Sequence, residues 1–475
     1  MGPVAKKARV DAALVRVVDL DDGCGRRVVV DADAIAAGSA VVEDTCPMFA
    51  LAPGERGRRC AECGCVAEGR ACDACETVIC QACRGVSGVL ERHDAECALL
   101  ADLCGASESI ILIAKLAKCA PAWIADLVAH AAVDAATAAN HALIAANLSQ
   151  LVGGAATPES VLRVVRAVAS NTYGMVDHGG LEGEPTWDAF VDGAGALFGA
   201  VVGIALSPKL AMINHACAPS ATLTFRFEAG AAPRGVARAA TNLKKGDSIT
   251  VSYIPFAATP TASRREALQA AFNFTCGCDA CARGAAVDAL LAATLGNDAA
   301  AADGDAARAC LGAVYEALPG EWRRADAALL RAKGPTAAFA PTHELRLQLD
   351  LAELHVAVAQ RCEARIVDVA TRLFAAVAPD ASTDAVAPDD STNTSTDAAL
   401  LRQLALDPVV LGRVYAIAAS CSADASRWKR LAWAKNATNA FLTHLGGDHA
   451  LSKAAARLQE AIDVRPDVDR VEVGL

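Results

Sequence analysis

The spacing of apolar residues changes along this chain from a strand-like to a helix-like period. Short β-branched runs at 13–18 and 27–30 flank a segment, 21–26, that contains two glycines, a pattern typical of a strand hairpin. From 106 to 169 apolar residues recur at helical spacing, which predicts several helices. Strand-like runs return between 221 and 255, with a turn at Lys245-Gly246-Asp247. We therefore expect a β-rich core interrupted by a helical insert.

Helical patterns dominate the second half of the chain. Ser263 and Glu266 have the spacing of a capping box, which predicts a helix from 263 to about 272. Beyond residue 281 the pattern is nearly all helical, most clearly over 344–376 and 426–463. The segment 378–397 is rich in Ser, Thr, Asp, Ala and Pro and lacks apolar periodicity, so we expect a mobile loop. The fold class is α+β.

Composition and charge narrow the classes of protein. A chain of 475 residues is longer than one core usually organises, so two or more domains are expected. Only 4% of residues are aromatic and alanine carries much of the 54% apolar content, which favours helices packed through small side chains. The net charge of −11 argues against a nucleic-acid partner and favours a basic protein partner. The uncharged run 193–208 is shorter than the roughly 18 residues of a membrane span, is glycine-rich and ends in a proline, so no membrane partner is expected.

Cysteine usage indicates the compartment. The chain has 19 cysteines and no signal peptide, which is typical of a reducing compartment where close Cys pairs bind zinc more often than they form disulfides. We therefore expect a cytoplasmic or nuclear location. Lys6, Lys7 and Arg9 suit a short nuclear-import signal or, equally, a solvated tail.

A cysteine-rich segment at 60–97 predicts metal sites. It has few large apolar residues, so a metal is needed to organise it. Three Cys-x-x-Cys pairs and one His-x-x-x-Cys pair supply eight ligands, enough for two tetrahedral zinc ions. These ligands are Cys60, Cys63, Cys72, Cys75, Cys80, Cys83, His93 and Cys97, with Cys65 as an alternative to Cys63. A chance run of buried or redox cysteines is the competing interpretation, and the recurrence of the spacing argues against it.

The segment resembles a MYND zinc finger. In that finger the first and third pairs share one zinc, and the second pair and the His-Cys pair share the other. The resemblance therefore implies one site at Cys60, Cys63, Cys80 and Cys83 and another at Cys72, Cys75, His93 and Cys97. The third pair here has two intervening residues where three are usual. Such fingers bind protein segments, which implies a peptide partner.

A second set of motifs resembles a SET domain with its post-SET cysteines. The motifs are Asn214-His215-Ala216-Cys217, Val251-Ser252-Tyr253 and Phe274-Thr275-Cys276-Gly277-Cys278-Asp279-Ala280-Cys281. With the finger, they make residues 10–283 similar to the SET and MYND domain family of protein lysine methyltransferases. That resemblance implies methyl transfer from S-adenosylmethionine to a lysine of a histone or non-histone protein. The implied layout is SET amino-terminal part 10–55, MYND finger 60–97, helical insert 98–169, SET core 170–258, post-SET 259–283 and a tetratricopeptide-like helical domain 284–475.

The resemblance also implies roles for individual residues. Tyr253 would orient the transferred methyl group and the lysine nitrogen. Cys217, Cys276, Cys278 and Cys281 would bind a third, structural zinc with no position left for water. The implied contacts of S-adenosylmethionine are Gly25 and Arg26 at its methionine end, Phe274 near its adenine, and Asn171, Asn214, His215 and Tyr253.

Three departures from the family pattern bear on activity. Ala216 replaces a serine, Ser220 replaces an asparagine, and Phe272 stands where many members have a second channel tyrosine. Loss of that hydroxyl would either change how many methyl groups are added or weaken catalysis. The alternative function is therefore a zinc-scaffolded adaptor with weak or absent transfer. A nucleic-acid regulator is disfavoured by the net charge, although Arg56, Arg58 and Arg59 form a local basic cluster.

Overall fold

The structure of the chain is a computed structural model. It describes residues 14–19, 26–67, 70–129, 134–179, 190, 200–254, 259–292, 300–317, 321–337, 339–377, 408–421 and 425–464. The expected loop at 378–397 and the basic residues near the amino terminus lie outside these residues. None of the described helices is long and apolar enough to cross a membrane.

Small sheets of two or three strands form the β core. β1 (Val15–Asp19) pairs with β2 (Arg26–Val30), which confirms the predicted hairpin. β10 (Arg234–Ala239) lies between β4 (Ala40–Thr45) and β9 (Ala221–Arg226), and β7 (Ala200–Leu206) lies between β5 (Met48–Leu51) and β6 (Tyr173–Asp177). The remaining pairs are β3 (Ala34–Ile35) with β11 (Leu243–Lys244), and β8 (Asn214–His215) with β12 (Thr250–Val251). Strands from before residue 52 thus pair with strands from after residue 199, so the core is assembled from both sides of the intervening segments.

Those intervening segments are helical, as predicted. α1 (Gln81–Arg84) and α2 (Val89–Asp102) belong to the cysteine-rich segment, followed by α3 (Glu108–Cys119), α4 (Ala135–Val152) and α5 (Pro158–Asn171). The side chains of Ser107, Asp134 and Thr157 cap the last three helices by accepting a backbone N–H of the first turn. Buried Leu112, Leu116 and Val165 pack with Leu206 of β7, so the helices share a core with the strands.

The predicted start of the next helix was wrong. α6 (Thr261–Phe272) begins after Pro260, two residues before the expected position, and Ser263 lies inside its first turn. The reason is a non-local partner, because the N–H of Thr261 donates to the Asp288 carboxylate at 2.7 Å. A carboxylate that arrives from another helix satisfies the exposed end, so no local capping box is used.

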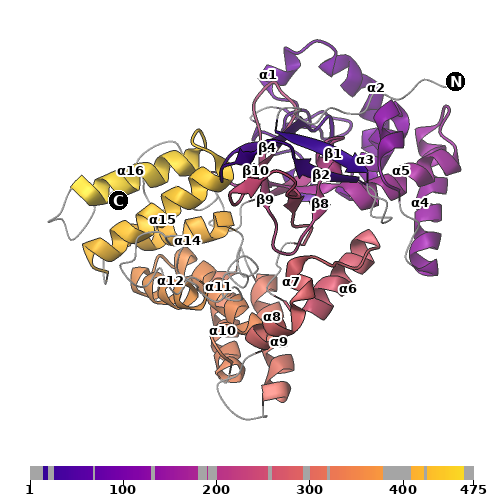
Figure 1. Cartoon of the computed structure of the whole chain (residues 1–475). Coiled ribbons are helices and arrows are strands. Elements are labelled where there is room, and N and C mark those ends of the chain that lie inside the picture. The colour runs from indigo at the N-terminus through magenta and orange to yellow at the C-terminus, as the bar shows by residue number, and fades with distance from the viewer. Residues whose placement is uncertain are drawn as a thin grey trace.

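The remaining helices stack in antiparallel fashion beneath and beside the β core (Figure 1). The predicted helical spans 344–376 and 426–463 are each interrupted, at Arg361 with φ +53° and at Gly446 with φ +85°. Phe374, Tyr415, Trp433 and Phe441 are buried in their core. The helices are α7 (Asp279–Ala282), α8 (Gly284–Leu291), α9 (Ala300–Ala317), α10 (Trp322–Thr336), α11 (Glu344–Ala359), α12 (Glu363–Val377), α14 (Pro408–Ser420), α15 (Arg427–Leu445) and α16 (Ala450–Val464).

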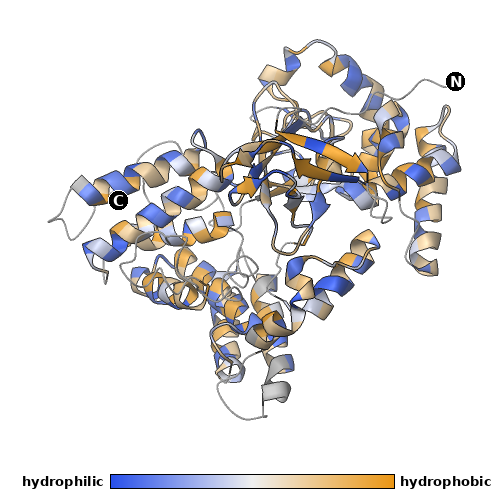
Figure 2. Ribbon diagram, in the orientation of Figure 1, coloured by the Kyte–Doolittle hydropathy of each residue, from blue (hydrophilic) through white to orange (hydrophobic). Residues whose placement is uncertain are grey.

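Two groups of helices flank the strands (Figure 1). α3, α4 and α5 lie on one side, whereas α14, α15 and α16 lie on the other, and the hydroxyl of Thr222 in β9 meets His444 Nδ1 of α15 at 2.7 Å. Figure 2 shows strands that are largely hydrophobic, whereas the outer helices carry mixed hydrophobic and hydrophilic residues. The β core is therefore held between helices on two sides.

Candidate functional site

The predicted finger ligands meet in two groups of four. One group is Cys60, Cys63, Cys80 and Cys83, and the other is Cys72, Cys75, His93 and Cys97, with the ligand atoms of each group within 4.8 Å of one another. The sulfurs of Cys63 and Cys80 are 3.8 Å apart, and those of Cys72 and Cys97 are 3.7 Å apart. A tetrahedral zinc with Zn–S bonds of about 2.3 Å places its sulfurs about 3.8 Å apart. Both groups therefore have the dimensions that zinc requires, and Cys65 is outside them.

The third group joins Cys217, which follows β8, to Cys276, Cys278 and Cys281 near α7. Cys217 Sγ lies 3.9 Å from Cys276 Sγ and 3.6 Å from Cys281 Sγ. All four ligands are sulfur, so a zinc held here would have no open position and a structural role. The group thereby ties two segments that lie about 60 residues apart to one point.

Two arginines of α6 support this group, and sequence reasoning missed both. Arg264 is buried, and its Nη2 lies 3.4 Å from the Ala280 carbonyl and 4.0 Å from Cys281 Sγ. Arg265 Nε donates to the Cys276 carbonyl at 3.1 Å. A buried guanidinium beside thiolates offsets part of their negative charge. Adjacent arginines on a helix have no spacing that distinguishes them from solvated ones, so the sequence held no signal for this role.

His215 connects the third group to Tyr253. Its Nδ1 accepts the backbone N–H of Tyr253 at 2.9 Å, so the ring proton resides on Nε2, which lies 3.3 Å from Cys217 Sγ. Burial lowers the pKa of His215 to about 4, and the ring is neutral near pH 7. Both ring nitrogens thus have protein partners, so a ligand would meet only the backbone or ring face of His215. The residue acts as a support between the metal group and the strand end that holds Tyr253.

Tyr253 lies at the centre of an aromatic cluster. Its ring centroid is 4.9 Å from that of Phe272, 5.3 Å from that of His215 and 6.4 Å from that of Phe274. The Tyr253 hydroxyl donates to the carbonyl of Ile213 at 2.5 Å. Burial raises the pKa of Tyr253 to about 12, so the phenol stays protonated at physiological pH. The fold thus brings together Tyr253, which is expected to orient the reacting groups, and Phe274, which is expected near the adenine.

The other expected cofactor residues fall into two places. Asn214 Nδ2 donates to the Arg26 carbonyl at 2.8 Å, so these two residues meet although 188 positions separate them. The Arg26 guanidinium also donates to the carbonyl of Asp126. Asn171 is buried at the end of α5, where its amide nitrogen donates to the carbonyls of Val128 and Ala167 at 2.6 and 2.7 Å. Gly25 lies outside the described residues.

A cavity of about 150 Å³ adjoins the cluster. It lies between the end of α5, β6, β9 and the segment that joins β12 to α6. Its wall combines apolar side chains with hydroxyl and amide groups, and none of the described lining residues carries a formal charge. Among those residues are Asn171, Tyr173, Phe225, Ser252, Tyr253 and Phe272. The cavity therefore suits a narrow alkyl chain that ends in a polar group.

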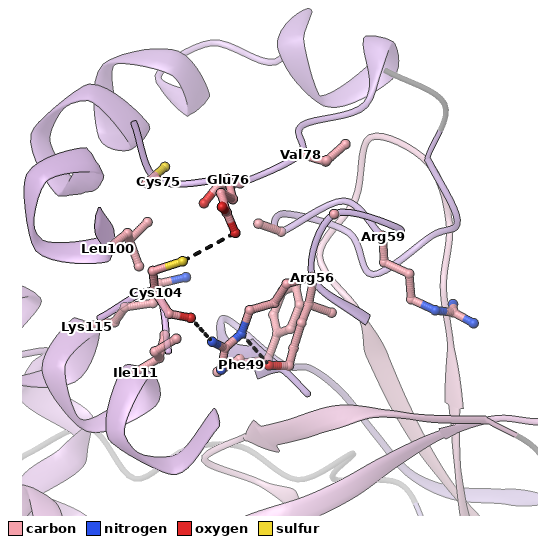
Figure 3. Close-up of a pocket in the computed structure, with 15 residues that line it drawn as sticks. Phe49, Arg56, Arg59, Cys75, Glu76, Val78, Leu100, Cys104, Ile111 and Lys115 are labelled. Atoms are coloured by element: carbon pink, nitrogen blue, oxygen red, sulfur yellow. Dashed lines mark hydrogen bonds between the residues drawn. The ribbon is translucent and has the colours of Figure 1, made fainter. Parts of the chain in front are cut away.

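A second cavity, of about 70 Å³, lies where the finger meets α3 and β5 (Figure 3). Arg56 Nη1 donates to the Cys104 carbonyl at 3.0 Å, and Cys104 Sγ lies 3.3 Å from the Glu76 carboxylate. Lys115 stands 5.9 Å above the ring of Phe49. These contacts connect the end of β5, the finger and α3, so this cavity marks a joint of the fold.

Two of the three arginines of the local basic cluster pair with carboxylates. Arg59 pairs with Glu55 at 2.6 Å and with Asp177 at 2.9 Å, and Arg58 pairs with Glu55 at 3.1 Å. The guanidinium of Arg56 is directed at main-chain carbonyls. The Arg59 side chain, which is buried between two carboxylates, is thereby poorly placed to contact a phosphate.

Fold and site together define a mixed helix and strand protein with three groups of zinc-type ligands, one of which adjoins an aromatic cluster. No family model matches the chain. Part of the chain is similar to "Histone-lysine N-methyltransferase ASHR1" of Arabidopsis thaliana, with 38% identity over 79 residues, which are 17% of this chain and 15% of that protein. It is also similar to "Histone-lysine N-methyltransferase Smyd1" of Mus musculus, with 32% identity over 100 residues, which are 19% of this chain and 20% of that protein. A third similar protein is "N-lysine methyltransferase SMYD2" of Homo sapiens, with 31% identity over 80 residues, which are 17% of each chain. The matches thus span about a fifth or less of the length of these relatives. They confirm the resemblance of the chain to the SET and MYND domain lysine methyltransferase family.

Proposed function

We propose that the protein is a protein-lysine N-methyltransferase that uses S-adenosylmethionine and acts on a lysine of a histone or non-histone protein. The observation that carries this proposal is the aromatic cluster around Tyr253, which adjoins an uncharged cavity and is fixed by His215 to a group of four sulfurs. The printed names of the relatives, which are lysine methyltransferases, support the same activity.

The residues around the cluster fit the chemistry of this cofactor. S-adenosylmethionine would supply the methyl group from a positively charged sulfonium. The ring faces of Tyr253 and Phe274 and the carbonyl of Ile213 present partial negative charge, which suits a cation. Arg26 carries the guanidinium that suits a carboxylate. Asn214 holds the backbone of Arg26 beside this set through its 2.8 Å hydrogen bond.

The cavity favours a neutral lysine amine. At pH 7 deprotonating a free lysine with pKa ~10.4 costs roughly 4–5 kcal/mol. The described lining residues carry no formal charge, so they offer an ammonium ion no counter-ion, and burial there lowers the pKa of an entering amine. Because the Tyr253 hydroxyl donates its hydrogen to Ile213, its oxygen is left to accept an N–H of that amine. That hydrogen bond holds the nitrogen close to Tyr253, and in-line displacement requires such positioning of the nucleophile.

The substitution Tyr253→Phe tests this function. It removes one oxygen and keeps the ring, so we expect S-adenosylmethionine affinity within about twofold of wild type and methyl transfer about 100-fold slower, in the range of a lost positioning or acid–base group. Calorimetry measures the affinity, and incorporation of labelled methyl into core histones and total cell protein measures transfer. Tyr415→Phe, in α14 outside the cavity, is the matched control. Unchanged transfer in Tyr253→Phe would overturn the role of this residue.

A second variant tests the cofactor pocket. Phe274→Ala removes a ring whose centroid is 6.0 Å from that of His215, and we expect affinity for S-adenosylmethionine to fall at least about tenfold, since a buried aromatic contact is lost. Zinc-loaded, folded wild-type protein that binds no S-adenosylmethionine would instead favour the adaptor. In either case we expect the finger to bind a protein segment.

A further inference from the structure

A second tyrosine lines the cavity, in which Phe272 offers no hydroxyl. It is Tyr173, the first residue of β6, whose ring meets that of Tyr253 edge-on, with centroids 6.0 Å apart at 79°. Tyr173, Tyr253 and Phe272 all line the same cavity. One residue, Thr172, separates Tyr173 from the end of α5 at Asn171, and the backbone of Tyr173 pairs with Ala205 of β7, so α5 and β7 fix its position.

The hydrogen bonds of the two phenols show which atoms remain for a ligand. The Tyr253 hydroxyl lies 2.5 Å from the Ile213 carbonyl, and the Tyr173 hydroxyl lies 3.0 Å from the Leu210 carbonyl and 3.2 Å from the Ile213 carbonyl. Each phenol has one hydrogen, and the shorter distances assign that of Tyr253 to Ile213 and that of Tyr173 to Leu210. Both oxygens then have lone pairs available as acceptors. Burial raises the pKa of both groups, so neither phenol ionises at physiological pH.

Two acceptors match the hydrogens of a primary amine. A neutral lysine nitrogen has two N–H groups and one lone pair, so one acceptor leaves the nitrogen free to rotate about a single hydrogen bond. Two acceptors fix both N–H groups and therefore the direction of the lone pair. A nitrogen that already carries one methyl has a single N–H left, and the same pair of oxygens holds it differently. The second acceptor therefore bears on both the rate of transfer and the number of methyl groups added.

We propose that Tyr173 is a positioning residue of the lysine channel and, together with Tyr253, supplies the second hydroxyl that Phe272 lacks. This inference rests on the proposed methyltransferase function. It places the hydroxyl on β6, on another element than the helix end that holds Phe272, whose ring centroid is 4.9 Å from that of Tyr253. The departure at Phe272 is then a relocation of the hydroxyl and does not by itself indicate a lost activity.

The substitution Tyr173→Phe, alone and with Phe272→Tyr, tests the inference. We expect Tyr173→Phe to bind S-adenosylmethionine within about twofold of wild type, to transfer methyl about tenfold more slowly because one hydrogen bond to the amine is lost, and to change the ratio of mono-, di- and trimethyl-lysine. The double variant returns a hydroxyl to the channel, and we expect transfer within about threefold of wild type. Mass spectrometry of methylated core histones and total cell protein gives rate and product ratio, with Tyr415→Phe as control.

A binding experiment tests the inference without a protein substrate. It measures how tightly n-butylamine, which mimics the lysine side chain, binds to protein saturated with S-adenosylhomocysteine. Saturation-transfer nuclear magnetic resonance should show about tenfold weaker binding to Tyr173→Phe, with recovery in the double variant. An active wild type with an indistinguishable Tyr173→Phe variant would overturn the inference alone. Loss of cofactor binding in step with transfer, without recovery in the double variant, would make Tyr173 a merely structural residue. Wild-type protein that binds neither cofactor nor amine would overturn the proposed function, and the inference with it.

Discussion

The finger and the carboxy-terminal helices are held together by different means. The described core of the finger is a cluster of Cys60, Cys63, Ile79, Cys80, Cys83 and Val89, in which four of the six residues are candidate ligands. The core of the helical region is built from large side chains that include Phe374, Trp433 and Phe441. In the finger a metal bound by these ligands would take the place of the apolar contacts that stabilise the helices. The comparison indicates that one chain combines a part built for a metal ion with a part whose core is formed by burial of apolar side chains.

Buried charge is also handled differently in the two regions. In the helices, Glu353 of α11 is buried and pairs with Lys333 at 2.7 Å, Arg365 at 3.0 Å and Arg372 at 2.7 Å. Arginine and lysine side chains thus surround a carboxylate, as the implied zinc ions would compensate thiolates in the finger. Burial acts to raise the pKa of Glu353, but these cations lower it below the usual value. The helical network needs no ion from outside the chain.

Removal of metal should produce the largest difference between the finger and the carboxy-terminal helices. With a chelator we expect the finger and the loop around Cys276–Cys281 to lose their order, since structural zinc contributes about 10–16 kcal/mol per site in isolated fingers. The helices α9–α16 should keep their circular dichroism signal. Elemental analysis should find three zinc ions before treatment, and limited proteolysis with mass spectrometry should locate new cleavage at 60–97. Loss of the helical signal at the same chelator concentration would contradict the conclusion that the helices fold without metal.

Neutralising the buried carboxylate should affect the other region. Glu353→Gln leaves three cations around an uncharged amide, so we expect the free energy of unfolding to fall by about 3–5 kcal/mol. Glu321→Gln is the matched control, because Glu321 and its partner Arg324 are 63% and 62% exposed, and an exposed pair contributes at most about 1 kcal/mol. Urea unfolding followed by circular dichroism measures both. Equal losses in the two variants would show that the network does not act as a buried unit, and zinc content should stay unchanged in each.

The features that could be predicted from the sequence are those in which the spacing of residues along the chain determines which residues meet. The three ligand groups could be predicted because Cys-x-x-Cys spacing and a family pattern state which residues meet, and the structure brings the same residues together. The hairpin at 15–30 was predictable for a similar reason, since its two strands are adjacent in the chain.

Roles that arise from distant partners could not be predicted. The cap of α6 comes from Asp288, 27 residues away, so the capping-box spacing at Ser263 does not mark the start of the helix. Tyr173 and Tyr253 share their surroundings only because β6 and the end of β12 meet at the Ile213 carbonyl. No spacing along the chain encodes that meeting, and Tyr173 was therefore not among the expected site residues.

The smallest expected effect concerns two neighbouring cysteines of the finger. Cys63 is fully buried and belongs to the first ligand group, whereas Cys65 is half-buried and outside it. Gly64, with φ +73°, turns the chain between them, and the Cys60 N–H donates to the Cys65 carbonyl at 2.9 Å, so Cys65 contributes its backbone to the turn. Cys65→Ser should therefore keep three zinc ions and change stability by less than about 0.5 kcal/mol, while Cys63→Ser should lose one ion. Elemental analysis of both variants decides the assignment, since a full zinc content in Cys63→Ser with a deficit in Cys65→Ser would make Cys65 the ligand.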